Sequence, residues 1–216
     1  MSIESWFYLI LICLMGASSP GPSLIVILRH AVADGRNAGI NAAVGHGIGI
    51  FIYALVSAIG LSFILTSFPK IFSLVQIFGG IFLLWIGFQV LRGGMSKRDL
   101  PNFGEDKTSI ERTTLNHFRD GFGIAILNPK ILAFFSSLFS QFLSAEQSFS
   151  IHMLMAIIAG FIDVSVYVII VFLVTLNSLL EFYRKKIFLF EIAFGLCLIL
   201  LGFSIFVVNF SLTNLG

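Results

Sequence analysis

The chain has 216 residues, of which 57% are hydrophobic and 11% are charged, and its mean hydropathy is +1.00. Soluble domains carry roughly 25% charged residues, so this composition excludes an ordinary soluble domain and predicts a protein of the lipid bilayer. The net charge of +2 argues against a nucleic-acid partner, and Cys13 and Cys197 lie in separate apolar runs that exclude a disulfide scaffold or zinc motif.

Six apolar stretches are long enough to cross a bilayer as helices, which takes about 20 residues each. They are residues 5–28, 38–66, 71–91, 120–142, 150–177 and 187–210. We therefore predict an all-α integral membrane protein with six transmembrane helices in a single transmembrane domain, residues 1–216. The segment that leads into the first stretch carries Glu4 and no basic residue, and the apolar character continues after the prolines through Leu28. We therefore interpret the first stretch as a span and not as a signal peptide.

The first stretch contains Pro20-Gly21-Pro22, and each proline lacks the amide that would bind the carbonyl four residues earlier. The carbonyls of Gly16 and Ser18 thus lose their helical partners, and the residues before the prolines are driven towards extended backbone. In a membrane, such backbone persists only where protein covers it or where it lines a wet cavity. We predict a broken helix here. The alternative is a kinked helix in which serine hydroxyls satisfy the carbonyls.

The second stretch contains Gly45-His46-Gly47, followed by Gly49. Gly45 and Gly49 are four residues apart, which is the spacing of a face that packs closely against another helix. His46 is open to two interpretations, because it either caps that contact or belongs to a transport path.

The fourth stretch contains a second proline interruption, Asn128-Pro129-Lys130. Pro129 frees the carbonyl of Ala125, and we predict a second helix break here. Lys130 follows Arg119 by about ten residues, or on the order of 15 Å along a helix, which places it near the membrane midplane. Ionised side chains at that depth are costly and mark functional sites, so we expect Lys130 to be paired or functional.

Asp163 is the other ionisable side chain at mid-span, in the fifth stretch. It is either hydrogen-bonded in its neutral form to a neighbouring helix or part of a proton path. We predict that Asp163 and Lys130 form a functional couple, by direct pairing or by lining one cavity together.

The basic residues predict the orientation, because loops rich in Lys and Arg stay in the cytoplasm. Eleven Lys and Arg residues fall in the loops after the first, third and fifth stretches, whereas the opposite loops and termini offer only Lys70. Both termini are therefore predicted to lie on the periplasmic or extracellular side.

The longest loop, about 92–119, divides the chain into two three-helix halves, repeat 1 (about 1–91) and repeat 2 (about 120–216). An odd number of spans in each half makes the repeats inverted, as in many secondary transporters. Residues 76–88 align without gaps with residues 191–203, which matches Gly80 and Gly87 to Gly195 and Gly202. The sequence thus predicts two inverted repeats with proline-interrupted helices 1 and 4.

Four motifs occur along the chain in the same order as in one known family. They are Pro20-Gly21-Pro22, the glycines Gly45, Gly49 and Gly60, Leu83-Leu84-Trp85-Ile86-Gly87, and Asn128-Pro129-Lys130. Together they resemble the lysine exporter and homoserine/threonine exporter family of bacteria. The resemblance covers nearly the whole chain, including Asp163, and implies efflux of amino acids or their derivatives across the inner membrane, driven by the membrane potential or a proton gradient. The chain departs from the family at Ile50 and Tyr53, where members often carry an acidic residue and a histidine.

We therefore predict a secondary transporter, not an enzyme, with a cavity between the two broken helices and no cofactor or metal. The predicted transport path comprises Pro20, Gly21, Pro22, His46, Asn128, Pro129, Lys130 and Asp163. A substrate carboxylate suits a helix N-terminus or Lys130, and an ammonium suits Asp163 or the freed carbonyls of Gly16, Ser18 and Ala125. The expected partners are an amino-acid-like substrate and the bilayer, and homo-oligomerisation is left open.

The alternative is a transmembrane electron carrier or channel of related fold. Such a carrier needs one cysteine beside the prolines of each half, and Phe122 stands where the second half would need the equivalent of Cys13. A hydrolase is not expected, because the chain has neither H-E-x-x-H nor G-x-S-x-G, and four histidines are few for a metal site.

Overall fold

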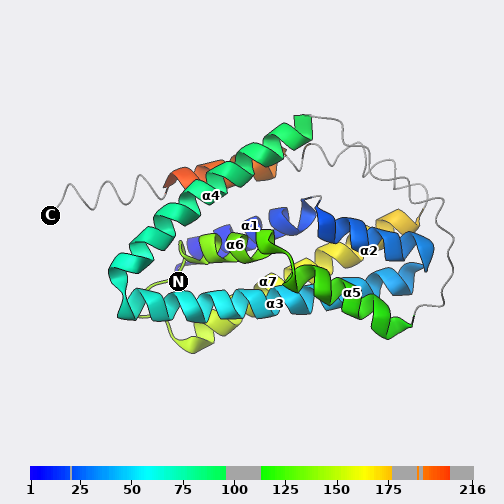
Figure 1. Ribbon diagram of the computed structural model, residues 1–216, viewed down its shortest axis with the longest axis horizontal. Helices are drawn as coiled ribbons and strands as arrows, with labels where there is room; N and C mark the ends of the chain where they lie inside the picture. Colours follow the sequence, from blue (N-terminus) through cyan, green and yellow to red (C-terminus); the bar gives the residue numbers. More distant parts are fainter. Residues whose placement is uncertain (20, 96–112, 177–188, 190–191, 205–216) are drawn as a thin grey trace.

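The computed structural model describes residues 1–19, 21–95, 113–176, 189 and 192–204. Its helices are α1 (Ile3–Ser18), α2 (Pro22–Ala33), α3 (Arg36–Ser67), α4 (Pro69–Met95), α5 (Thr114–Ile126), α6 (Pro129–Phe139), α7 (Phe149–Thr175) and the helix Ile192–Ser204 (Figure 1). Over these residues the chain forms helices and short connections without any strand, so the all-α prediction is confirmed for the described part.

Three of the described helices, α3, α4 and α7, are each long and apolar enough to cross a membrane, and the bent pair of α1 and α2 is a fourth candidate. The bounds of α3, α4 and α7 agree to within a few residues with those of the second, third and fifth predicted spans. The fourth predicted span corresponds to α5 and α6, which have 13 and 11 residues. The sixth is helical over Ile192–Ser204, and its last residues lie outside the described part of the chain.

Large apolar side chains lie on the outer surface of these helices. Phe78, Trp85, Phe161 and Leu200 are each more than half exposed. Apolar surface of this kind is unfavourable in water and is compatible with lipid acyl chains. The arrangement agrees with a membrane protein.

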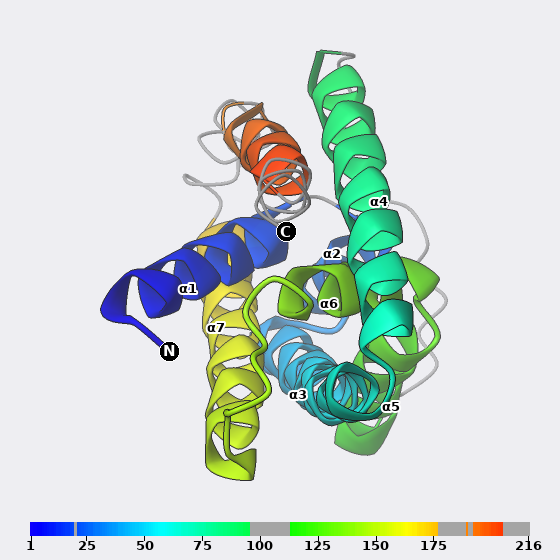
Figure 2. The same cartoon turned by 90° about the vertical axis from the view of Figure 1, so that its left-hand side faces the viewer.

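The third helix, α3, is the centre of the packing and contacts α2, α4, α5, α6 and α7. A methyl group added to Gly45 would overlap the carbonyl of Phe118 in α5, and one added to Gly121 of α5 would overlap the carbonyl of Ala42. The two backbones therefore touch, as small residues permit in membrane helices. Gly45 and Gly49 both face α5, so the predicted close-packing face of the second span is confirmed. Figure 2 shows α6 beside α3 and α4.

Glycines also join α4 to the helix Ile192–Ser204. A Cβ atom on Gly87 would lie 2.7 Å from the carbonyl oxygen of Gly195, and one on Gly202 would lie 2.9 Å from that of Gly80. Because Gly87 meets the start of the second helix and Gly80 its end, the two helices run in opposite directions. They lie side by side in Figures 1 and 2.

Candidate functional site

The first helix break separates α1 from α2, and the two helices meet at an angle of 58°. Ser19, which ends α1, and Gly21, which precedes α2, both have extended backbone, and Pro22 is the first residue of α2. This agrees with the predicted effect of the prolines on the residues before them. Pro20 lies outside the described residues.

The second break separates α5 from α6 and is capped on both sides. The side chain of Asn128 accepts a hydrogen bond from the amide of Lys130, 3.0 Å away, and Pro129 begins α6. On the other side, the hydroxyl of Tyr53 in α3 donates to the carbonyl of Ile126, the last residue of α5. Both predicted interruptions are thus confirmed. At the second one, a side chain from α3 provides a hydrogen bond to the last carbonyl of α5.

Two carbonyls that we predicted to be open have backbone partners instead. The amide of Ser19 donates to the carbonyl of Gly16 at 3.2 Å, and the amide of Asn128 donates to that of Ala125 at 3.3 Å. The chain tightens into a shorter turn at each break, which satisfies the carbonyl that the proline left without a helical donor. The prediction that these two carbonyls are open to bind an ammonium group is therefore wrong.

The two breaks border one cavity, in which about 90 Å³ is open to water-sized molecules. Gly21 and Pro22 line it from the first break, and Asn128 and Lys130 line it from the second. A methyl group on Gly21 would meet no atom within 4 Å, because this backbone faces open space. The predicted meeting of the two breaks is therefore found in the structure.

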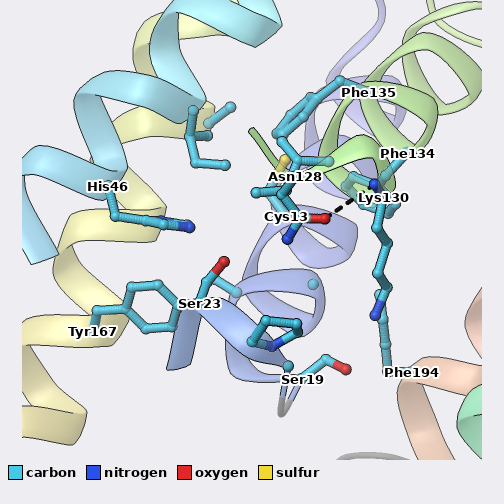
Figure 3. Close-up of a pocket in the computed structure, with 17 residues that line it drawn as sticks. Cys13, Ser19, Ser23, His46, Asn128, Lys130, Phe134, Phe135, Tyr167 and Phe194 are labelled. Atoms are coloured by element: carbon cyan, nitrogen blue, oxygen red, sulfur yellow. Dashed lines mark hydrogen bonds between the residues drawn. The ribbon is translucent and has the colours of Figure 1, made fainter. Parts of the chain in front are cut away.

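The wall of the cavity is mainly apolar, with a few polar groups at separate points. Polar side chains among the lining residues belong to Ser19, Ser23, His46, Asn128, Lys130 and Tyr167. Figure 3 shows His46 and Tyr167 on one side and Lys130 on the opposite side, near Phe194. An apolar pocket with few polar anchors is typical of a site for a small molecule.

His46 joins the cavity to Asp163. Its Nδ1 atom lies 2.7 Å from Oδ2 of Asp163, and both residues are at most 5% exposed. Its Nε2 atom is buried and has no hydrogen-bond partner in the described part of the chain. His46 is also one of the residues that line the cavity.

The two residues of the predicted couple, Lys130 and Asp163, have different surroundings in the structure. Lys130 lines the cavity, whereas Asp163 is not among the described lining residues and its carboxylate binds His46. The cavity-lining member of the buried pair is the histidine. Direct pairing of Lys130 with Asp163 stays a prediction.

Sequence reasoning missed Tyr167 and Ser23 as lining residues. Tyr167 follows Asp163 by four residues on α7, which places both on one helix face, and its ring centroid lies 5.0 Å from that of His46. That spacing is a signal that could have identified Tyr167. Ser23 follows Pro22 directly at the start of α2, but a serine in an apolar helix gives no comparable signal.

Comparison with known proteins places the chain in a family. A relative from Escherichia coli K12, the uncharacterized membrane protein YahN, is 32% identical over 59% of this chain and 56% of its own length. The threonine efflux protein of Salmonella typhi is 28% identical over 63% of this chain and 66% of its own length. The leucine efflux protein of Klebsiella pneumoniae is 28% identical over 59% of this chain and 58% of its own length. The chain therefore matches less than two thirds of the length of these relatives.

No solved structure gives a significant match to the chain. The sequence profile of the LysE type translocators matches residues 14–209. This range includes both helix breaks and all of the described helices except the first part of α1. This extent agrees with the resemblance found in the motifs. The chain therefore belongs to the LysE type translocator family.

Proposed function

We propose that this protein is a secondary transporter that exports amino acids or their derivatives across the bacterial inner membrane. Membership of a translocator family and relatives named threonine and leucine efflux proteins support this activity. The single observation that carries it is the cavity between the two broken helices, which is lined by Lys130 and by His46, a residue whose Nε2 atom has no hydrogen-bond partner in the described part of the chain. Neither the family nor these relatives favour an electron carrier or an enzyme.

In this proposal the cavity holds an amino acid by its two charged ends. The ammonium of Lys130 attracts the carboxylate, helped by the positive dipole ends of α2 and α6, which both begin at the cavity. The Nδ1–H group of His46 donates a hydrogen bond to Asp163. The lone pair on Nε2 of this neutral ring then accepts a hydrogen bond from the substrate ammonium. Asp163 therefore acts on the substrate through His46, and not by direct contact.

We further propose that Asp163 and His46 carry the proton that drives export. The 2.7 Å contact allows a proton to pass between carboxylate and ring. A proton held on Nε2 removes the lone pair that accepts the ammonium, so proton and substrate compete for one atom. Competition of this kind couples proton entry to substrate release, because occupancy by one excludes the other.

The proposal includes six spans in two inverted repeats, with both termini on the outer face. The glycine contacts between α4 and Ile192–Ser204 support it. A two-fold axis that exchanges Gly80 with Gly195 and Gly87 with Gly202 turns the Gly80–Gly202 contact into the Gly195–Gly87 contact, which also occurs. A reporter fused after Gly216 tests the orientation. Activity of a reporter that functions only in the cytoplasm would contradict it.

The proposed activity is tested by efflux from cells that accumulate amino acids from supplied dipeptides. Expression of the protein should speed the release of at least one amino acid from a panel that includes threonine and leucine. Cells that carry the empty vector and cells that express Lys130→Met are compared at equal membrane content. Release of every amino acid at the vector rate would argue against amino-acid export.

A further inference from the structure

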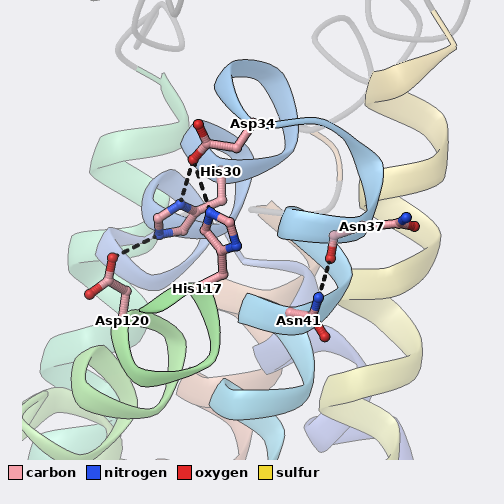
Figure 4. A network of polar contacts seen from close by, with 6 residues as sticks. All are labelled: His30, Asp34, Asn37, Asn41, His117 and Asp120. Carbon is pink, nitrogen blue, oxygen red and sulfur yellow. Dashed lines mark hydrogen bonds and ion pairs between the residues drawn. The ribbon is translucent and has the colours of Figure 1, made fainter. Parts of the chain in front are cut away.

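Four ionisable side chains meet between the end of α2 and the start of α5 (Figure 4). His30 and Asp34 lie one helical turn apart at the end of α2, and His117 and Asp120 lie in the first turns of α5. The two histidine residues are 2% and 5% exposed, whereas the side chains of Asp34 and Asp120 are 30% and 47% exposed. Two shielded imidazoles thus stand beside two carboxylates that remain accessible from outside.

Three atoms of this cluster that could bind a metal ion, one each from His30, Asp34 and His117, lie close together. Nδ1 of His30 lies 3.4 Å from Oδ2 of Asp34, and Nε2 of His117 lies 3.1 Å from the same oxygen. All three atoms lie within 4.8 Å of one another. Ligand atoms bound to a tetrahedral zinc ion at about 2.0–2.1 Å are roughly 3.3 Å apart. Two of the three separations already match that spacing, and only the separation between the two imidazole nitrogens has to shorten.

Asp120 is placed to support a ligand role for His30. Its Oδ2 atom lies 3.1 Å from Nε2 of His30, on the other side of the ring from the converging atoms. Metal-binding histidines almost always donate their second ring N–H to a carboxylate, carbonyl or water. That hydrogen bond fixes the orientation of the ring and strengthens the nitrogen that binds the metal. His30 has this partner in the structure.

We propose that His30, Asp34 and His117 bind a divalent transition-metal ion such as Zn²⁺, with Asp120 orienting His30. Two imidazoles and one carboxylate suit zinc, cobalt and nickel, and they leave a coordination position for water. No residue of this cluster is among the described residues that line the cavity. The proposal is therefore independent of the transported substrate.

The ion would join the two halves of the chain. His30 and Asp34 belong to repeat 1, and His117 and Asp120 belong to α5, which leads from the central loop into repeat 2. The basic loops predict that this end of the bundle is cytoplasmic. The sequence alone does not indicate this site, because Asp34 on α2 and His117 on α5 are 83 residues apart. This is why the histidine count alone predicted no metal site.

The test uses the full-length protein, purified in detergent without a polyhistidine tag and stripped with a chelator. It is titrated with Co²⁺, whose absorption bands report coordination, and then with Zn²⁺ as competitor. We expect one Co²⁺ per chain, displaced by Zn²⁺. His117→Gln keeps a hydrogen-bond donor near Asp34 but removes the imidazole, so it should abolish the Co²⁺ spectrum. Asp120→Asn should keep one site and weaken binding by about 10- to 100-fold.

His152→Gln is the matched control, because His152 is another buried histidine, in α7 outside the cluster. It should bind Co²⁺ like the wild type. Circular dichroism and gel filtration check the fold of each variant, and Asp34→Asn replaces His117→Gln if the latter does not fold. The metal content of untreated wild-type protein, measured by mass spectrometry, needs no variant. Wild type without stoichiometric binding, or equal binding by folded His117→Gln or Asp34→Asn, would overturn the proposal.

Discussion

His46 of α3 binds Asp163 of α7 through one ring nitrogen, with 2.7 Å between Nδ1 and Oδ2, and leaves the other nitrogen beside the cavity. That second atom, Nε2, is buried and lacks a partner in the described part of the chain. An unsatisfied buried polar group costs about 1–3 kcal/mol. A transported molecule that hydrogen-bonds to Nε2 would recover this free energy.

Asp163→Asn should separate substrate exchange from proton-driven export. The asparagine keeps a polar contact to His46 but cannot take up a proton, so net efflux driven by a pH gradient should stop. Exchange of labelled for unlabelled substrate across proteoliposomes needs no net proton movement and should continue. Loss of both activities in a folded variant, or unchanged efflux, would contradict a proton role for Asp163.

Lys130→Met should weaken substrate binding more than it slows transport. A charge-assisted hydrogen bond contributes about 1.5–3 kcal/mol, which corresponds to roughly 10- to 100-fold in affinity. The KM for export should therefore rise by about that factor, while the maximal rate changes less. An unchanged KM would show that the substrate carboxylate does not meet this ammonium group.

Tyr53→Phe should destabilise the second helix break. The Tyr53 hydroxyl donates to the carbonyl of Ile126, and its loss leaves that carbonyl unsatisfied at a cost of about 1–3 kcal/mol. Each kcal/mol lowers the Tm of a chain of this size by about 2–4 °C. Thermal unfolding in detergent measures the change. Tyr8→Phe, at an exposed position of α1, is the control and should keep the wild-type Tm.

Gly121→Ala should disrupt the contact between α5 and α3, and Gly123→Ala should not. A methyl group on Gly121 would overlap the carbonyl of Ala42, whereas one on Gly123 would meet no atom within 4 Å. Overpacking costs about 1–3 kcal/mol or more, while alanine at the open position gains up to about 1 kcal/mol of helix propensity. The Tm values should therefore move in opposite directions. Equal values would show that the two backbones are not in contact.

The helix breaks could be predicted from the sequence because their cause is local. A proline removes its own amide and constrains the residue before it, so Pro22 and Pro129 fix where α2 and α6 begin. The glycine face of α3 has a similar local signal in the spacing of Gly45 and Gly49. The two breaks, which lie in halves predicted to be inverted, led to the prediction of one cavity between two broken helices.

The polar partners could not be predicted because they depend on which helices meet. His46 and Asp163 are 117 residues apart, and an apolar helix gives little information about which of its faces is buried. The same is true of Tyr53 and Ile126. The partners of the Gly16 and Ala125 carbonyls could not be predicted either, because they depend on the chain tightening into a turn at each break.

Efflux from proteoliposomes, compared between His46→Gln and His152→Gln, tests most directly whether transport runs through the cavity. Both variants remove a buried histidine, but only His46 lines the cavity and binds Asp163. The vesicles are loaded with the amino acid that cells release fastest, and a pH gradient is imposed. We expect His152→Gln to export at the wild-type rate and His46→Gln to export at the rate of empty vesicles. Equal export by both folded variants would contradict a transport path through His46.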